Sequence, residues 1–122
     1  MSKQQNNEME KNLSDEQVKL YSTISPLLKS AFKEVKDFSK KKQDDLLNIK
    51  KVNMINRLLE KAKIVLQNES TVDFLDLLDE NDLPSNSDAV LIMSQYISAM
   101  DKFYNDHCHI RGWGFDEEGE WQ

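Results

Sequence analysis

Apolar residues recur with helical spacing along most of the chain. Between Asp44 and Gln67 they gather on one side of a helical wheel: Leu47, Val52, Met54, Ile55, Leu58, Leu59, Ala62, Val65 and Leu66. Their arc is about 160° wide, broader than the stripe a surface helix needs to lie on one partner. We therefore expect a central helix over Asp44–Gln67 that at least two neighbours cover.

An earlier amphipathic pattern runs from residue 18 to residue 38. Ser14 and Gln17 have the spacing of a capping box, which places the start of this helix at Ser14. Pro26 lies inside the pattern and removes one backbone hydrogen bond. Because the apolar phase continues across Pro26, the pattern favours one kinked helix. A break with Ser25 as the cap of a second helix is the competing arrangement.

Two further helices are expected after the central one. The first is a brief helix over Val72–Asp79, which Ser70 or Thr71 would cap. Pro84 and the turn-forming residues after it then mark the clearest break in the chain. The last helix runs from Asp88 to about His107, with Ser85 or Ser87 as its cap. It has one clean apolar face, from which only Leu91 strays.

These patterns predict an all-α fold: a small antiparallel bundle of three long helices and one short one. The chain has only three glycines and two prolines and no run of alternating β-branched residues, which argues against a sheet. We expect a disordered N-terminal arm at residues 1–12 and the bundle domain at residues 13–110. Residues 111–122 form an acidic, aromatic C-terminal tail, either irregular or folded as a small hairpin.

Charge is distributed unevenly along the chain, although its net value is only −6. Residues 1–68 carry 14 Lys and Arg against nine acids, a net charge of +5, and residues 69–122 carry two against 13, a net charge of −11. Such a split can indicate a basic or an acidic interaction surface. Alternatively, the two halves pack beside one another and neutralise part of the field.

Several classes of protein and of site find no support in the sequence. A single cysteine cannot form an internal disulfide, the N-terminus lacks the apolar core of a secretion signal, and no apolar run is long enough to span a bilayer. We therefore expect a cytoplasmic protein. His107, Cys108 and His109 are metal-ligand types, but consecutive helical residues diverge too far to close a site. We expect no metal, no cofactor and no catalytic residues, and the least favoured alternative is a metal-dependent enzyme at a dimer interface around His107 and His109.

The charged and aromatic edges of the chain carry the functional hypotheses. Tryptophan is enriched at binding hot spots, and acids surround the aromatic residues of the tail. The candidate partner-binding residues are Trp113, Phe115, Trp121, Asp76, Asp79 and Glu80. Lysines at the first helix–helix turn are the alternative, an anion- or nucleic-acid-binding site at Lys40, Lys41, Lys42, Lys50 and Lys51. An ordinary solvated helix end is the favoured explanation of these lysines.

We therefore expect a small non-enzymatic protein that binds another protein, as an accessory subunit, an adaptor or an antitoxin-like inhibitor. The alternative is the anion- or nucleic-acid-binding module at the lysine-rich turn. The wide apolar arcs would also leave surface for a homodimer, and no membrane partner is expected.

Overall fold

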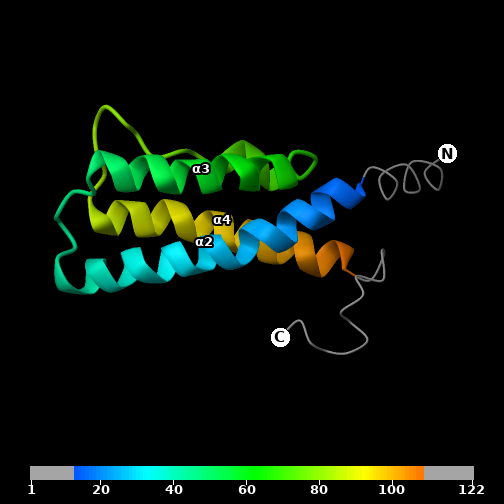
Figure 1. The fold of residues 1–122 in the computed structure, drawn as a ribbon, viewed down its shortest axis with the longest axis horizontal. Coiled ribbons are helices and arrows are strands. Elements are labelled where there is room, and N and C mark those ends of the chain that lie inside the picture. Colours follow the sequence, from blue (N-terminus) through cyan, green and yellow to red (C-terminus); the bar gives the residue numbers. More distant parts are fainter. Residues whose placement is uncertain (1–12, 109–122) are drawn as a thin grey trace.

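The chain folds as a small all-α bundle, as the sequence predicts (Figure 1). The computed structural model describes residues 13–108. Within this range three α-helices form: α2 (Asp15–Lys41), α3 (Ile49–Val65) and α4 (Asn86–His107). A 3-10 helix, η1 (Ser70–Phe74), follows α3. The predicted arm at residues 1–12 and the predicted tail at residues 111–122 lie outside the described residues.

Helix α2 confirms the predicted capping box and the single-helix arrangement. The Ser14 hydroxyl accepts a hydrogen bond from the Gln17 backbone N–H at 3.0 Å, and the Gln17 side chain accepts one from the Ser14 N–H at 3.1 Å. Pro26 lies inside the continuous helix. The first part of α2, drawn in blue, is inclined to the cyan remainder (Figure 1). A bend is expected there because Pro26 has no N–H to donate to the Ser22 carbonyl.

The central helix begins later than predicted, so the expected start at Asp44 is wrong. Asn48 is the N-cap of α3, and its side chain accepts from the Lys51 backbone N–H at 2.9 Å. The preceding residues form a turn that pairs with the segment before α4. In this pairing the Leu47 N–H donates to the Pro84 carbonyl at 2.9 Å, and the Asn86 N–H donates to the Asp45 carbonyl at 2.8 Å. Those tertiary hydrogen bonds replace the ones that an earlier helix start would have made.

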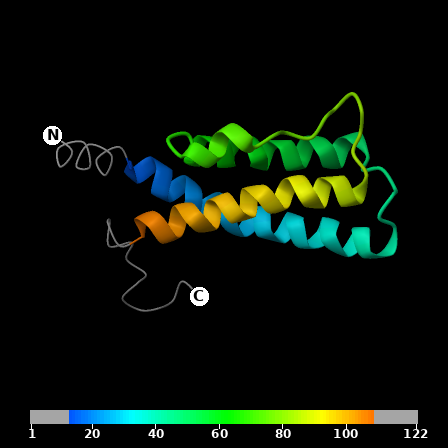
Figure 2. The same ribbon diagram turned by 180° about the vertical axis from the view of Figure 1, so that it is seen from behind.

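Helices α3 and α4 both run opposite to α2 and therefore parallel to one another (Figures 1 and 2). The two helices begin side by side, where the backbones of Leu46 and Ser85 form an isolated bridge. We call this the turn end of the bundle. At the opposite end the buried side chain of Gln17 donates to the Val65 carbonyl at 3.0 Å and so ties the start of α2 to the end of α3.

Helix α2, not the predicted central helix, is the element against which both other helices pack. It makes most of the close contacts between helices, with both α3 and α4, whereas α3 and α4 make few with one another. The apolar arc of α3 is also narrower than expected, since Met54 is 59% exposed. The second neighbour of α3 is the irregular segment between η1 and α4, which we call the connector, residues 75–85.

The core lies between the three helices and the connector. Its fully buried large side chains come from all three helices and from Leu66, the residue that caps the end of α3. They are Leu28, Val52, Leu59, Val65, Leu66, Met93, Tyr96, Met100 and Phe103. Leu75 and Leu78 of the connector join this cluster. Leu91 is 60% exposed, as its place off the apolar face of the last helix predicts. None of the helices in residues 13–108 has the length and apolar character needed to cross a membrane.

Candidate protein-interaction surfaces

The connector replaces the short helix that the sequence predicts at Val72–Asp79. That prediction is wrong in both position and type, because η1 ends at Phe74 and residues 75–79 are not helical. A buried asparagine of α3 compensates for the missing helical hydrogen bonds. The Asn56 amide nitrogen donates to the Leu78 carbonyl, and the Asn56 amide oxygen accepts from the Leu78 N–H, both at 2.8 Å.

Two further side chains hold the connector backbone. The Tyr96 hydroxyl of α4 donates to the Asp76 carbonyl at 2.9 Å, and the Lys63 ammonium of α3 donates to the Leu75 carbonyl at 3.0 Å. Burial, and to a smaller degree the Asp76 charge, raises the pKa of Tyr96 above its ordinary value, so the hydroxyl stays protonated and remains a donor. We call Asn56, Lys63 and Tyr96 the connector clamp. The clamp fixes an irregular segment to two helices at once.

The clamp determines which connector side chains face solvent. Leu75 and Leu78 point into the core, whereas Phe74 at the end of η1 is 77% exposed, the most exposed large apolar side chain in residues 13–108. Leu77 is also exposed, at 37%. The carboxylates of this stretch all lie at the surface: Asp73, Asp76, Asp79, Glu80 and Asp82. We call these five carboxylates, together with the exposed Phe74 and Leu77, the acidic surface.

The predicted partner-binding acids of this surface are not equivalent. Asp76 and Glu80 are exposed. One carboxylate oxygen of Asp79 accepts from the backbone N–H groups of Asn81 and Asp82, at 2.8 and 3.1 Å, so Asp79 shapes the tip of the connector. Asp76 and Glu80 therefore remain the acids best placed to meet a partner.

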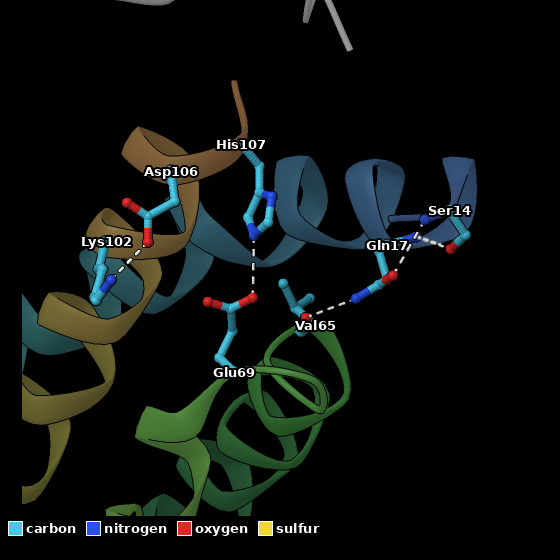
Figure 3. A network of polar contacts seen from close by, with 7 residues as sticks. All are labelled: Ser14, Gln17, Val65, Glu69, Lys102, Asp106 and His107. Atoms are coloured by element: carbon cyan, nitrogen blue, oxygen red, sulfur yellow. Dashed lines mark hydrogen bonds and ion pairs between the residues drawn. The ribbon is translucent and has the colours of Figure 1, made fainter. Parts of the chain in front are cut away.

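A groove of about 580 Å³ runs between this surface and α4. Polar and small side chains of α4 form one wall, and η1 with the start of the connector forms the other: Thr71, Phe74, Leu75, Asp76, Ser94, Gln95, Ser98, Ala99 and Lys102. Lys102 donates to the Asp106 carboxylate at 2.6 Å (Figure 3), and this hydrogen bond raises the pKa of Lys102. The only cation of the groove lining is therefore paired with a carboxylate of its own helix.

The lysine-rich turn forms a second surface at the turn end of the bundle. All five predicted anion-binding lysines are exposed, and none forms an ion pair within residues 13–108. Three of them, Lys41, Lys42 and Lys51, line a pocket of about 280 Å³ with Phe38 and Leu46 at its apolar edge. Lys40 and Lys50 lie outside this lining. We call the pocket that Lys41, Lys42 and Lys51 line the lysine pocket.

The predicted histidine–cysteine cluster has a structural role in the described part of the chain. His107 is mostly buried, and its Nε2 lies 3.1 Å from the Glu69 carboxylate beside η1 (Figure 3). Its ring packs against Phe103, with the ring centres 4.9 Å apart, and no described residue forms a hydrogen bond with its buried Nδ1. Residues 13–108 contain no group of three or more His, Cys, Asp or Glu arranged to hold a metal. His109 lies outside the described residues.

The aromatic candidates Trp113, Phe115 and Trp121 also lie outside the described residues. In their place, the structure identifies residues that the sequence analysis did not single out. Phe74 falls within the short helix predicted at Val72–Asp79, and Asn56 is a polar interruption of the apolar stripe of α3. That interruption was the one sequence signal for a buried polar contact.

Comparisons of the chain with protein-family models, curated proteins and solved structures found no match. The fold and its surfaces thus define a class only: a small all-α bundle with a clamped acidic connector and a basic pocket at one end.

Proposed function

We propose that this protein binds a basic, partly apolar segment of another protein at the acidic surface and its groove, and that it acts through this contact rather than by catalysis. An accessory subunit, an adaptor or an inhibitor would all work this way. The observation that carries the proposal is Phe74, which is 77% exposed on a backbone next to the clamped connector.

The clamp gives this surface a property that a free loop lacks. Ordering a loop on binding consumes about 0.5–1.5 kcal/mol for each immobilised side chain, together with the backbone entropy. The Asn56, Lys63 and Tyr96 hydrogen bonds fix the backbone beside Phe74 before any partner arrives. Aromatic side chains, phenylalanine among them, are enriched in the core of protein interfaces, and a preorganised backbone lowers the cost of binding.

The charges of the surface specify the partner's chemistry. Asp73 and Asp76 flank Phe74, and Glu80 continues the acidic surface, while Lys102 in the groove is paired with Asp106. A partner segment with Lys or Arg beside one large apolar side chain matches this arrangement. Exposed charges of this kind act mainly on the association rate and on specificity.

Site-specific photo-crosslinking tests the proposal. A photoreactive amino acid at position 74 should crosslink to one partner protein in the source cells, whereas the same residue at Leu91, 60% exposed on α4, should not. Phe74→Ala should then raise the dissociation constant for that purified partner at least tenfold, and Leu91→Ala should change it less than twofold. Equal crosslinking at both positions, or unchanged affinity in Phe74→Ala, would overturn the proposal.

Charge variants provide a second readout. Asp76→Asn combined with Glu80→Gln should slow association and flatten its dependence on ionic strength, with little change in the dissociation rate. Both side chains are exposed, so circular dichroism should show an unchanged helical signal. A partner that bound the double variant faster would have to be acidic, and the proposed chemistry would be wrong.

A further inference from the structure

The lysine pocket has the chemistry of a peptide-binding site. Lys41, Lys42 and Lys51 line it without ion-pair partners in residues 13–108, and only one acid, Asp45, belongs to the same lining. Phe38, 37% exposed, completes it on the apolar side. A row of phosphates would need cations spaced along a track, whereas this pocket combines three cations with apolar surface.

The pocket is built from fixed elements. The Lys51 ammonium lies 4.5 Å from the centre of the Phe38 ring, so one lysine is already positioned by an aromatic side chain. The buried Asn86 side chain donates to the Lys42 carbonyl at 2.8 Å, which ties the end of α2 to the start of α4. The beginning of α3 lies in the same lining, and its dipole adds positive potential there.

The sequence of the chain contains a segment with the complementary chemistry. Residues 113–121 combine two tryptophans and a phenylalanine with four acids, and no basic residue interrupts them. We propose that the lysine pocket binds this acidic, aromatic segment of a second copy of the chain. The contact uses a different surface from the proposed partner site and does not depend on it.

The length of the chain limits which residues of the segment can reach the pocket of their own copy. Asn86, the first residue of α4, lines the pocket, and α4 has 22 residues, so the pocket and the end of α4 are about 33 Å apart at 1.5 Å per residue. A fully extended chain covers at most about 3.5 Å per residue. Phe115, seven residues beyond Cys108, therefore reaches only about 25 Å. A copy cannot place Trp113 or Phe115 in its own pocket, although Trp121, 13 residues beyond Cys108, could reach about 45 Å. A contact that includes Trp113 or Phe115 therefore needs a second copy.

Each copy has one pocket and one segment, so two copies that exchange segments satisfy every site. Such a reciprocal contact closes as a two-fold dimer and leaves no site open for further growth.

Tryptophan fluorescence reports on this contact without a label, because the two tryptophans of the chain, Trp113 and Trp121, both belong to the proposed segment. The tryptophan emission maximum of the full-length protein should shift to shorter wavelength as the protein concentration rises. At high salt, which screens exposed charges, the maximum should return to its position in the dilute protein. Sedimentation should show a dimer over the same concentration range. A shift that persists unchanged at high dilution would mean occupancy within one copy and would overturn the proposal.

Two full-length variants test the contact by complementation. The pocket variant, Lys41→Glu with Lys51→Glu, keeps the tryptophans but should neither shift nor dimerise. The segment variant replaces Trp113, Phe115 and Trp121 by Ala, so it is silent in fluorescence but keeps its pocket. Mixing the two should restore the shift, saturating at equal amounts. No shift on mixing would overturn the proposal.

A matched variant and a competing ligand complete the test. Lys36→Glu with Lys61→Glu makes the same charge change at exposed lysines outside the pocket and should dimerise like the natural protein. A synthetic peptide of residues 111–122 should compete for the pocket. If instead a DNA or RNA oligonucleotide binds the natural protein and not the pocket variant, and the peptide does not displace it, the pocket binds phosphates and the proposal is wrong.

Discussion

Replacing Asn56 by Leu should release the connector while leaving the helices in place. Asn56 is 5% exposed, and its amide makes two 2.8 Å hydrogen bonds with the backbone of Leu78. Leucine has a similar size but no polar atoms, so the Leu78 N–H and carbonyl would both lose their partner. Each buried polar group left unpaired costs about 1–3 kcal/mol. We expect the free energy of unfolding to fall by about 2–6 kcal/mol, a large share of the 5–15 kcal/mol typical of such domains.

Chemical denaturation and hydrogen exchange measure this effect. The denaturation midpoint should fall, and the Leu78 amide should exchange at least tenfold faster, while amides in the middle of α2 change only as global stability requires. Asn53→Leu, at an exposed position of the same helix, is the control and should change stability by less than about 0.5 kcal/mol. If Asn56→Leu lost no more stability than this control and kept the Leu78 amide protected, the clamp would not hold the connector.

Three further substitutions test individual contacts. Tyr96→Phe removes the donor to the Asp76 carbonyl and should lower the free energy of unfolding by about 1 kcal/mol. Because burial raises the pKa of Tyr96 in the folded state, the natural protein should lose stability as the pH rises above about 10. If the Tyr96→Phe variant showed the same alkaline loss, Tyr96 would not be its source. Ser14→Ala removes the N-cap of α2 and should cost about 1 kcal/mol by thermal denaturation, whereas a neutral result would mean that the first turn is already frayed. Pro26→Ala restores a donor for the Ser22 carbonyl and should stabilise the protein by about 1–3 kcal/mol; a loss of stability would show that packing requires the bend.

Local signals were sufficient to predict the three long helices and the cap of α2, and they narrowed the cap of α4 to Ser85 or Ser87. The capping box of Ser14 and Gln17 and the exposure of Leu91 each follow from a few neighbouring residues, and Ser85 is one of the two caps predicted for α4. The continuity of α2 across Pro26 followed from an apolar phase that does not slip. These features depend on spacing within one helix, which is what a hydrophobic pattern records.

The features that were missed depend on contacts between residues far apart in the chain. The α3 start at Ile49 rather than Asp44 reflects backbone hydrogen bonds to residues 84–87. The connector is irregular rather than helical because side chains far away in sequence supply its hydrogen bonds, among them Asn56, 22 residues before Leu78. The candidate surface could not be predicted for the same reason: Phe74 is exposed at the end of η1, immediately before the connector that Asn56 holds.

The net charge of each half of the sequence does not show where the charged side chains lie in the fold. Helices α2 and α4 pack side by side, yet the ion pair between them in residues 13–108 joins exposed side chains, Lys29 and Asp101, at 3.6 Å, and such pairs contribute little. Away from that pair, five carboxylates lie on the acidic surface, and three lysines line the lysine pocket at the turn end of the bundle.

One variant can separate the two proposed contacts. Asn56→Leu should loosen the acidic surface and so weaken partner binding, even though Asn56 is buried and touches no partner. The lysine pocket is held by different bonds, among them those of Asn86 to Lys42 and Asp45, so dimerisation read by tryptophan emission should persist. The pocket variant, Lys41→Glu with Lys51→Glu, should show the reverse. If either variant abolished both activities while circular dichroism remained helical, the two surfaces would act as one site, and the assignment of separate roles would be wrong.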